Sequence, residues 1–504
     1  MKPGTWKLDD GPLDDRPTFL AHALAMSLRH GPGPWPDEAQ ELHDEPPRPP
    51  GGAPYLPSVS RDGVETHHFS PRPDPEAVAE VAETICALAT AGVPDPGDLR
   101  RLHARLETVS ALAIVDEVLE HLARVRPPRE RVHRIGRHLA EYGTAREAVK
   151  VGLALVGATG GEPDRELLLL LGTLEEFTLY AVVALVRTQP DRQRAAYELA
   201  RRVTCWGRVH AVERLKGCDD PEIKAWLLRD GFRNGVMNEY LAHLAATTGG
   251  LYEALLEPEV DNALLDGAAA ILAALAEGGP AEDMSDYADG RPAMSRLADL
   301  LRVRPATLDR LANLLTIRHH LKDDPLRGRY DALAAEPRWR ERVMASLADP
   351  GHPDFHHALW LADRLDLPTA TELAARLERE PTDDYAWSKA VEQDPARFAG
   401  MAERLLPLAE LARGPELHHG FGQDCDPDRS LESVVGGLGS VPGLGVTLIE
   451  TALRNRVIRV RRQAVATLAA WPAVPGRLMD RVRQAAGVEP DEDTRREMLT
   501  LSER

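Results

Sequence analysis

Residues 208–215 read RVHAVERL and residues 461–468 read RRQAVATL, so both stretches carry the pattern R-x-x-A-V-x-x-L. At about 3.6 residues per helical turn, the Ala and the Leu of this pattern fall on one face of a helix. A short turn and a proline follow each stretch, Pro221 after the first and Pro472 after the second, and proline suits the first position of a helix. This recurring helix, turn and helix predicts an all-α protein built as an α-α superhelix, or α-solenoid.

Composition favours the same fold class. The chain has 504 residues, of which 43% are hydrophobic and 5% aromatic, and it contains only 8 Ile. Leu, Ala, Arg and Glu, which form helices well, fill the long periodic segments, whereas the β-branched and aromatic residues that strands prefer are sparse. Because the hydrophobic content is sufficient for a buried core, we do not expect global disorder.

Charge and cysteine content bear on partners and compartment. The formal net charge is −19, which repels phosphate backbones, so we do not expect nucleic acid as a partner. The 4 Cys contain no C-x-x-C pair, and the start of the chain, Met1 to Asp15, has no apolar segment. No uncharged stretch is long enough for a membrane span. We therefore expect a cytoplasmic protein without a membrane partner.

The chain is expected to divide near residue 74. Residues 1–74 are rich in Pro and Gly and predict an irregular N-terminal arm with at most one short helix, at 18–29. Residues 30–70 in particular are expected to contain little regular structure. Aromatic residues recur in the arm and suggest that it is pinned along the rest of the protein. They are Trp6, Phe19, Trp35, Tyr55 and Phe69.

Residues 75–504 are expected to form the solenoid, with the best-defined repeats near 205–245 and 444–485. Asp74-Pro75 predicts the start of a helix, and Thr144-x-x-Glu147 has the spacing of a capping box. The segments 277–292 and 414–445 are predicted to be irregular loops longer than repeat turns. Further helices are predicted at 101–125, 129–142, 165–187, 191–203, 236–247, 261–277, 293–302, 306–321, 338–348, 354–365, 369–379, 396–413 and 444–454.

The pattern R-x-x-A-V-x-x-L, followed by Asp-Pro-Glu-Ile at 220–223, resembles the HEAT repeat, one of the armadillo-like solenoid repeats. Residues 205–290 are also similar to uncharacterised bacterial HEAT-like proteins, some of which carry a limonene hydroxylase label. The resemblance implies a curved stack of antiparallel helix pairs that binds another macromolecule. No haem, flavin or nicotinamide motif is legible in the chain, so we expect no cofactor.

Motifs of metal and nucleotide sites are weak. Adjacent side chains diverge on a helix, so the four His-His pairs do not indicate a shared metal. Asp424-x-Asp426-x-Asp428 starts like a calcium loop, but Arg429 and Val435 stand where Gly and Glu are needed. No strand precedes residues 437–439, as a dinucleotide loop would require. Three pairs have the Glu-x-x-His spacing of di-iron bundles, at a frequency that chance supplies. They are Glu65 and His68, Glu130 and His133, and Glu416 and His419. We expect no metal site and no catalytic residues.

One block departs from the residue usage of the chain. Only 5 Asn occur in the whole sequence, yet Asn, Lys, Ile, Phe, Met and Tyr gather within 223–240. The clustering favours either a well-packed repeat pair or an interaction hot spot. In the second case, exposed Arg, Asn and Tyr side chains would line one concavity suited to a peptide or a carboxylate-bearing ligand. The candidate binding residues are Arg229, Arg233, Asn234, Asn238, Glu239, Tyr240 and His243.

Three classes of function stay open. The one we favour is a protein–protein interaction or scaffold protein that binds a partner protein or peptide on the solenoid surface. The second is an enzyme with a site in residues 205–290, where Asp283, Asp286 and Asp289 could hold a cation. The third is a HEAT-like nucleic-acid-binding module, which would need a basic concave strip that a net charge of −19 does not favour.

Overall fold

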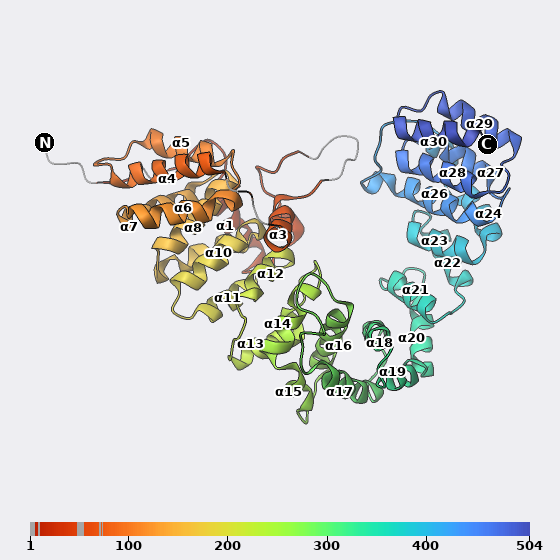
Figure 1. Cartoon of the computed structure of the whole chain (residues 1–504), viewed down its shortest axis with the longest axis horizontal. Coiled ribbons are helices and arrows are strands. Elements are labelled where there is room, and N and C mark those ends of the chain that lie inside the picture. Colours follow the sequence, from red (N-terminus) through yellow and green to blue (C-terminus); the bar gives the residue numbers. More distant parts are fainter. Residues whose placement is uncertain (1–5, 9–10, 48–54, 70–71, 73, 504) are drawn as a thin grey trace. The chain divides into compact units, whose positions relative to one another are not determined.

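A computed structural model shows a protein built from α-helices (Figure 1). No β-strand occurs among the residues it describes, where a single isolated bridge joins His418 and Val457. The all-α class predicted from the sequence pattern is therefore confirmed. The described residues are 6–8, 11–47, 55–69, 72 and 74–503.

The chain divides into two compact units. Unit 1 comprises residues 1–46, 56–305 and 313–333, and unit 2 comprises residues 47–55, 306–312 and 334–504. The α-helices that lie in unit 1 are α1 (Phe19–His30), α2 (Asp37–Gln40), α3 (Ser58–His68), α4 (Pro75–Thr90), α5 (Pro96–Leu106), α6 (Ala111–Val125), α7 (Arg129–Tyr142), α8 (Arg146–Thr159), α9 (Arg165–Gly172), α10 (Glu175–Thr188), α11 (Arg192–Ala200), α12 (Cys205–Glu213), α13 (Pro221–Trp226), α14 (Glu239–Gly249), α15 (Leu251–Leu256), α16 (Asn262–Glu277) and α17 (Gly290–Arg302).

Two helices meet the boundary between the units, α18 (Leu308–His320) and α19 (Arg327–Ala334). The α-helices of unit 2 are α20 (Pro337–Leu347), α21 (Phe355–Arg364), α22 (Ala370–Arg379), α23 (Asp384–Gln393), α24 (Pro395–Leu405), α25 (Leu408–Leu411), α26 (Asp426–Gly437), α27 (Val446–Ala452), α28 (Ile458–Ala470), α29 (Gly476–Ala486) and α30 (Glu492–Ser502).

Helices pack mainly on partners that are close in sequence. In unit 1, α8 contacts α7 and α10, α10 contacts α12, and α14 contacts α16. In unit 2, α26 contacts α23 and α28, and α28 contacts α30. Glycines permit the closest of these approaches. A Cβ on Gly136 of α7 would lie 2.8 Å from the Leu155 Cβ of α8, and one on Gly152 would lie 2.8 Å from the Ala140 nitrogen.

The two copies of the R-x-x-A-V-x-x-L pattern behave alike. Arg208 and Arg461 are both buried, and each donates a hydrogen bond to a carbonyl five residues earlier, Val203 O at 2.9 Å and Arg456 O at 2.9 Å. Each also pairs with a carboxylate of a later segment, Asp230 and Glu489 respectively. The motif arginine thus ties the start of its own helix to a following element.

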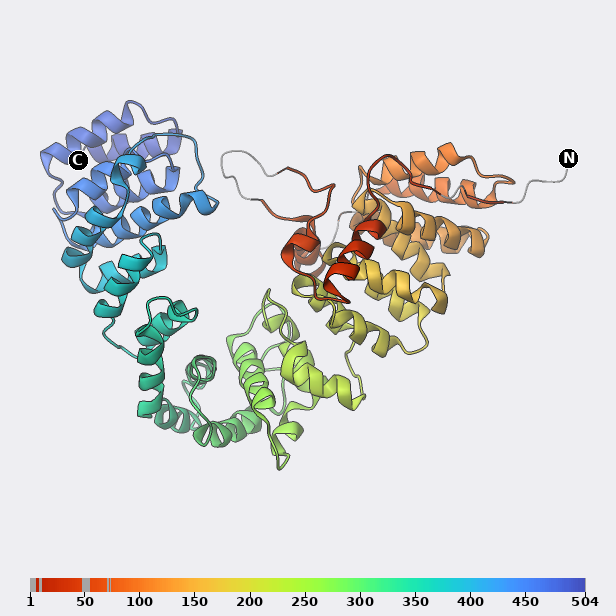
Figure 2. The same ribbon diagram turned by 180° about the vertical axis from the view of Figure 1, so that it is seen from behind.

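The N-terminal region is more regular than predicted. α1 lies at the expected place, but α2 and the 11-residue α3 are additional, so the prediction of at most one helix and little structure in 30–70 is wrong. The sequence of α3, SVSRDGVETHH, is largely polar and hides its helical period. Tertiary contacts with α10 and α12 hold it in place (Figure 2).

Buried ion pairs dock the N-terminal region on α8 and α10. The Lys150 ammonium is fully buried and lies 2.8 Å from Asp62 of α3 and 2.7 Å from Glu176 of α10. Burial lowers the pKa of Lys150, but the surrounding carboxylates more than offset this and hold it well above its usual value. Arg146 of α8 pairs in the same way with Asp44, at 2.7 Å. Removing one partner of such a pair typically costs about 3–5 kcal/mol.

The aromatic residues of the arm are mostly pinned, as predicted. The Trp6 indole donates a hydrogen bond to Leu88 O at 3.1 Å. Phe19 is fully buried against Phe177, with 5.2 Å between ring centroids. Trp35 is buried too, whereas Phe69 is 67% exposed. The N-terminal segment therefore contributes to the core of unit 1.

Two local predictions are wrong. Thr144 and Glu147 do not form a capping box, because the Thr144 hydroxyl donates to Asp14 and α8 begins after Ala145 without a side-chain cap. The segment 414–445 is not entirely loop, because it contains the 12-residue α26. Its acidic start and its end at Gly436-Gly437 resemble loop sequence, but Leu431, Val434 and Val435 are buried against neighbouring helices.

Candidate functional site

The predicted binding block begins with an irregular helical turn. Residues Leu227–Gly231 form a π-helix directly after α13, and π-bulges are frequent at functional sites. This turn pushes the Leu228 carbonyl toward α16, where a Cβ on Gly267 would lie only 1.9 Å from the oxygen. Glycine is therefore the residue that fits at position 267.

The predicted arginines of the block already have partners on the protein. Arg229 is half-buried, pairs with Asp261 at 2.8 Å and donates to Ala225 O at 3.1 Å. Arg233 is exposed and lies over the ring of Phe232, 4.8 Å from its centroid. Only Arg233 presents its guanidinium largely to solvent.

Asn234 holds the local backbone. Its side chain is 2% exposed. The amide nitrogen donates to Phe232 O at 3.2 Å and Met237 O at 2.8 Å, and the oxygen accepts from the backbone nitrogens of Val236 at 2.8 Å and Met237 at 2.9 Å. The expectation that Asn234 belongs to an exposed binding face is therefore wrong.

The other candidates are half-buried at the start of α14. Asn238 precedes the helix and makes no side-chain capping bond. Glu239 packs against Gly279, and the His243 imidazole lies 3.4 Å from Asp286 O. Tyr240 faces a different group, because its hydroxyl lies 2.7 Å from His68 Nε2. The predicted residues therefore do not line one concavity.

An open groove of about 990 Å³ lies beside this block, lined by α13 to α16, the π-turn and residues 286–289. Among the seven predicted residues only Arg229 lines it. Its charged lining is mostly acidic, with Lys224 and Arg229 as the basic members. We call it the acidic groove after its carboxylates, Asp219, Glu253, Glu257, Glu259, Asp286 and Asp289.

The carboxylates of the acidic groove are available to a ligand. Most of these carboxylates are exposed, and none forms an ion pair with a described residue. Arg229, a basic residue of the groove lining, pairs with Asp261 and not with a groove carboxylate. Asp283, Asp286 and Asp289 do not assemble as cation ligands. The Asp283 carboxylate accepts from Ser285, and Asp286 accepts from the Asp283 nitrogen.

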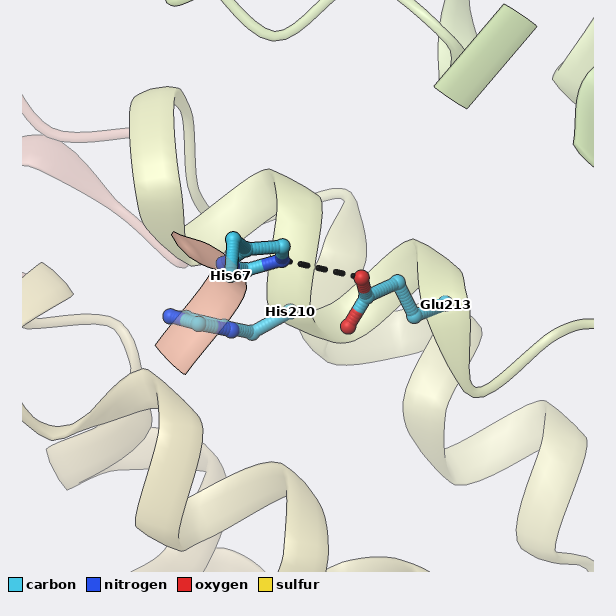
Figure 3. Close-up of side chains that lie close together, drawn as sticks. All are labelled: His67, His210 and Glu213. Carbon is cyan, nitrogen blue, oxygen red and sulfur yellow. Dashed lines mark hydrogen bonds and ion pairs between the residues drawn. The ribbon is translucent and has the colours of Figure 1, made fainter. Parts of the chain in front are cut away.

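A second site brings α3 and α12 together. His67 of α3 meets His210 and Glu213 of α12, and their ligand atoms all lie within 4.8 Å of one another (Figure 3). His67 Nε2 lies 3.0 Å from a Glu213 oxygen, and the Nδ1 of the same ring lies 2.8 Å from Gly63 O. His210 and Glu213 are one helical turn apart, so they face the same way. We call this group the His67 cluster.

Aromatic rings and a glycine enclose the His67 cluster. Trp206 and Tyr240 lie 5.2 Å and 5.3 Å from the ring of His67, centroid to centroid. Gly63 of α3 lets the indole approach, since a Cβ there would lie 2.2 Å from the ring of Trp206. The neighbouring His68 points to Tyr240 instead, as expected for adjacent helical positions.

Electrostatics differ between the two histidines. Burial lowers the pKa of His210 to about 4, so its imidazole is neutral near pH 7. Burial also lowers the pKa of His67. The hydrogen bonds to Glu213 and Gly63 together outweigh this effect and bring the pKa of His67 above its usual value. Burial raises the pKa of Glu213, yet His67 and His210 bring it below the ordinary value.

A third group lies in unit 2. His418, Asp424 and Cys425 also have ligand atoms within 4.8 Å of one another. His418 Nδ1 already accepts from Gly420 N at 3.0 Å, and burial raises the pKa of the Cys425 thiol. A buried thiol that stays protonated is a poor nucleophile and a poor ligand. Of the two three-residue groups, this one is therefore less suited to metal binding than the His67 cluster.

No sequence motif indicates the His67 cluster. None of the three Glu-x-x-His pairs belongs to a three-ligand group among the described residues. His133 binds Asp164 at 2.9 Å, and Asp428 of the loop that resembles a calcium site accepts from Asn455 at 2.8 Å. The only sequence signal was the reverse spacing, His210-x-x-Glu213, and its third member comes from 143 residues earlier in the numbering of the chain.

Comparison of the chain with protein-family models, curated proteins and solved structures found no match. None of the helices in the described part of the chain combines the length and apolar character needed to cross a membrane.

Proposed function

We propose that this protein is a HEAT-like α-solenoid scaffold that binds a Lys- and Arg-rich segment of a partner protein in the acidic groove. The observation that carries the proposal is the lining of that groove, where six carboxylates lie without an ion-pair partner among the described residues. Opposite charges across an interface speed encounter and select the correct partner.

Two features of the fold support the solenoid part of the proposal. Most helices pack on partners close along the chain, as successive repeats do. Arg208 and Arg461 occupy equivalent places in two helices, which supports a common repeat. The free cysteines accord with a reducing compartment, and this supports our proposal of a cytoplasmic location.

The groove favours a basic peptide over the other ligands considered. A carboxylate-bearing ligand would meet like charge, because the predicted Arg229 is already paired with Asp261. A nucleic-acid backbone would be repelled for the same reason. No catalytic constellation lines the groove, so we propose binding and no reaction there.

The proposal is tested with a fluorescent peptide rich in Lys and Arg, titrated with the full chain. A triple variant, Glu253→Gln, Glu257→Gln and Glu259→Gln, removes three exposed charges of the groove. We expect a roughly tenfold loss of affinity, about 1.4 kcal/mol, and weaker binding by the unaltered chain as salt rises.

The matched control is Glu76→Gln, Glu83→Gln and Glu120→Gln, which removes three exposed charges from α4 and α6. The proposal requires this control to bind the peptide as the unaltered chain does. Equal losses in both triple variants would mean that only net charge attracts the peptide. Absence of saturable peptide binding by the unaltered chain would also overturn the proposal.

A further inference from the structure

We propose that His67, His210 and Glu213 bind a divalent transition-metal ion of the Zn(II) class, which joins α3 to α12. The inference is independent of the acidic groove, because no residue of the cluster lines it. It rests on the ligand types, on the orientation of the His67 ring, and on the burial of His210 without a hydrogen-bond partner among the described residues.

The ligand set suits such an ion. Two imidazole nitrogens and one carboxylate oxygen are the three-ligand set that several catalytic zinc sites use, with the fourth position left to water. Imidazole favours Zn, Cu, Fe and Ni over Mg and Ca, which prefer oxygen ligands throughout. The cluster contains no thiol, so a soft monovalent ion such as Cu(I) has no preferred ligand here.

The surroundings of His67 orient it as a ligand. Its Nδ1 lies 2.8 Å from Gly63 O, and a backbone carbonyl at one ring nitrogen is the usual partner of a metal-bound histidine. Its Nε2 then faces the Glu213 carboxylate at 3.0 Å. Both ring nitrogens thus face acceptors, and only a proton or a metal ion can lie between Nε2 and the carboxylate.

His210 is the second independent observation. Its side chain is 5% exposed, and neither ring nitrogen has a hydrogen-bond partner among the described residues. A largely buried polar group without a partner destabilises the fold. A metal ion bound to the ring nitrogen that faces His67 and Glu213 would satisfy it.

The geometry requires a small closure. Two ligands about 2.0 Å from a tetrahedral ion lie roughly 3.3 Å apart, close to the 3.0 Å between His67 Nε2 and Glu213. All ligand atoms of the cluster lie within 4.8 Å of one another, so the side chains must close in by at most about 1.5 Å on binding. The Glu213 side chain is 33% exposed, which leaves a path for the ion to enter.

The site has a structural consequence. α3 is an 11-residue polar helix that depends on tertiary contacts. An ion bound to the docked form and not to the free form stabilises docking by mass action. Metal binding should therefore stabilise the packing of α3 against α12.

The experiment titrates Zn(II) into metal-free full chain that carries no histidine tag. His418→Gln is present in every sample to remove the cluster in unit 2. We expect one Zn(II) per chain, and X-ray absorption should show two imidazole ligands. Absence of stoichiometric Zn(II) binding would overturn the proposal. A coordination shell with fewer than two imidazoles would overturn it as well.

The variant pair His67→Gln and His68→Gln then locates the site. The two residues are adjacent on α3, but only His67 faces the cluster. His67→Gln should lower Zn(II) affinity by roughly 100-fold or more, since loss of an outer-shell partner alone costs about 10–100-fold. His68→Gln should leave affinity unchanged. Equal affinities of the two variants would place the bound metal elsewhere and sink the inference.

Discussion

At the scale of single residues, the predicted binding block separates into side chains that hold the fold and side chains that face outward. Asn234 has both its amide nitrogen and its oxygen engaged by the backbone of residues 232–237. Asn238, one turn later, makes no side-chain capping bond. The same residue type therefore has different roles four positions apart.

Asn234→Ala should destabilise the protein, whereas Asn238→Ala should not. Four hydrogen bonds at about 1 kcal/mol each, together with the backbone groups left buried and unpaired, predict a loss of roughly 2–4 kcal/mol for Asn234→Ala. Thermal unfolding of the two variants side by side measures the difference. Equal midpoints for both variants and the unaltered chain would show that the Asn234 bonds contribute little.

Asp164 provides a residue-scale prediction for pH. Its side chain is 1% exposed and is held by His133 at 2.9 Å, by Arg137 at 2.8 Å and by the Gly161 nitrogen at 2.9 Å. Burial raises the pKa of Asp164, but these hydrogen bonds and charges bring it below its usual value. Arg137 is shared with Glu141.

Because the pKa of Asp164 is lower in the folded state, its ionised carboxylate stabilises the fold above the unfolded pKa of about 4. That contribution is lost as pH falls through the folded value. We expect Asp164→Asn to lose stability at pH 7 and the gap to the unaltered chain to narrow below about pH 4. Urea unfolding at several pH values checks this, and a gap that widens on acidification would contradict it.

At the scale of elements, the packing of the polar helix α3 depends on its close contact with Trp206. Gly63→Ala should loosen it, because the new Cβ would lie 2.2 Å from the Trp206 ring. Overpacking costs about 1–3 kcal/mol, which exceeds the gain of about 1 kcal/mol in helix propensity. Hydrogen exchange of residues 58–68 should become roughly tenfold faster or more.

The control for this element is Gly92→Ala, where a Cβ would meet nothing within 4 Å. It should leave exchange in α3 unchanged. Unchanged exchange in Gly63→Ala as well would mean that α3 and α12 tolerate a larger separation than the close Gly63–Trp206 contact indicates.

At the scale of the whole molecule, the carboxylates behind the net charge of −19 differ in whether they are paired. Buried carboxylates such as Glu176 and Glu489 are paired with Lys150 and Arg461, so they serve the fold. The acidic groove keeps carboxylates unpaired. The groove carboxylates therefore remain able to attract a partner, whereas the buried and paired carboxylates do not.

Much of the fold could be predicted because helix periodicity is local. The start of α4 follows from Asp74-Pro75, and α12 and α28 follow from their repeated pattern. Predicted helices that ran on too long, such as 396–413, were split in the structure at Pro407. α3 was missed because its residues are polar, and its helix is held by Lys150 and Trp206 from distant helices.

The sequence alone determined the helical class and the acidic character of the protein, since both depend on residue types and spacings of a few positions. Only the tertiary structure decided which side chains meet. His67 reaches His210 and Glu213 because Gly63 lets α3 approach Trp206 closely. Arg229 pairs with Asp261, which lies on another segment far along the sequence. Such contacts are set by packing between helices, which local periodicity does not encode.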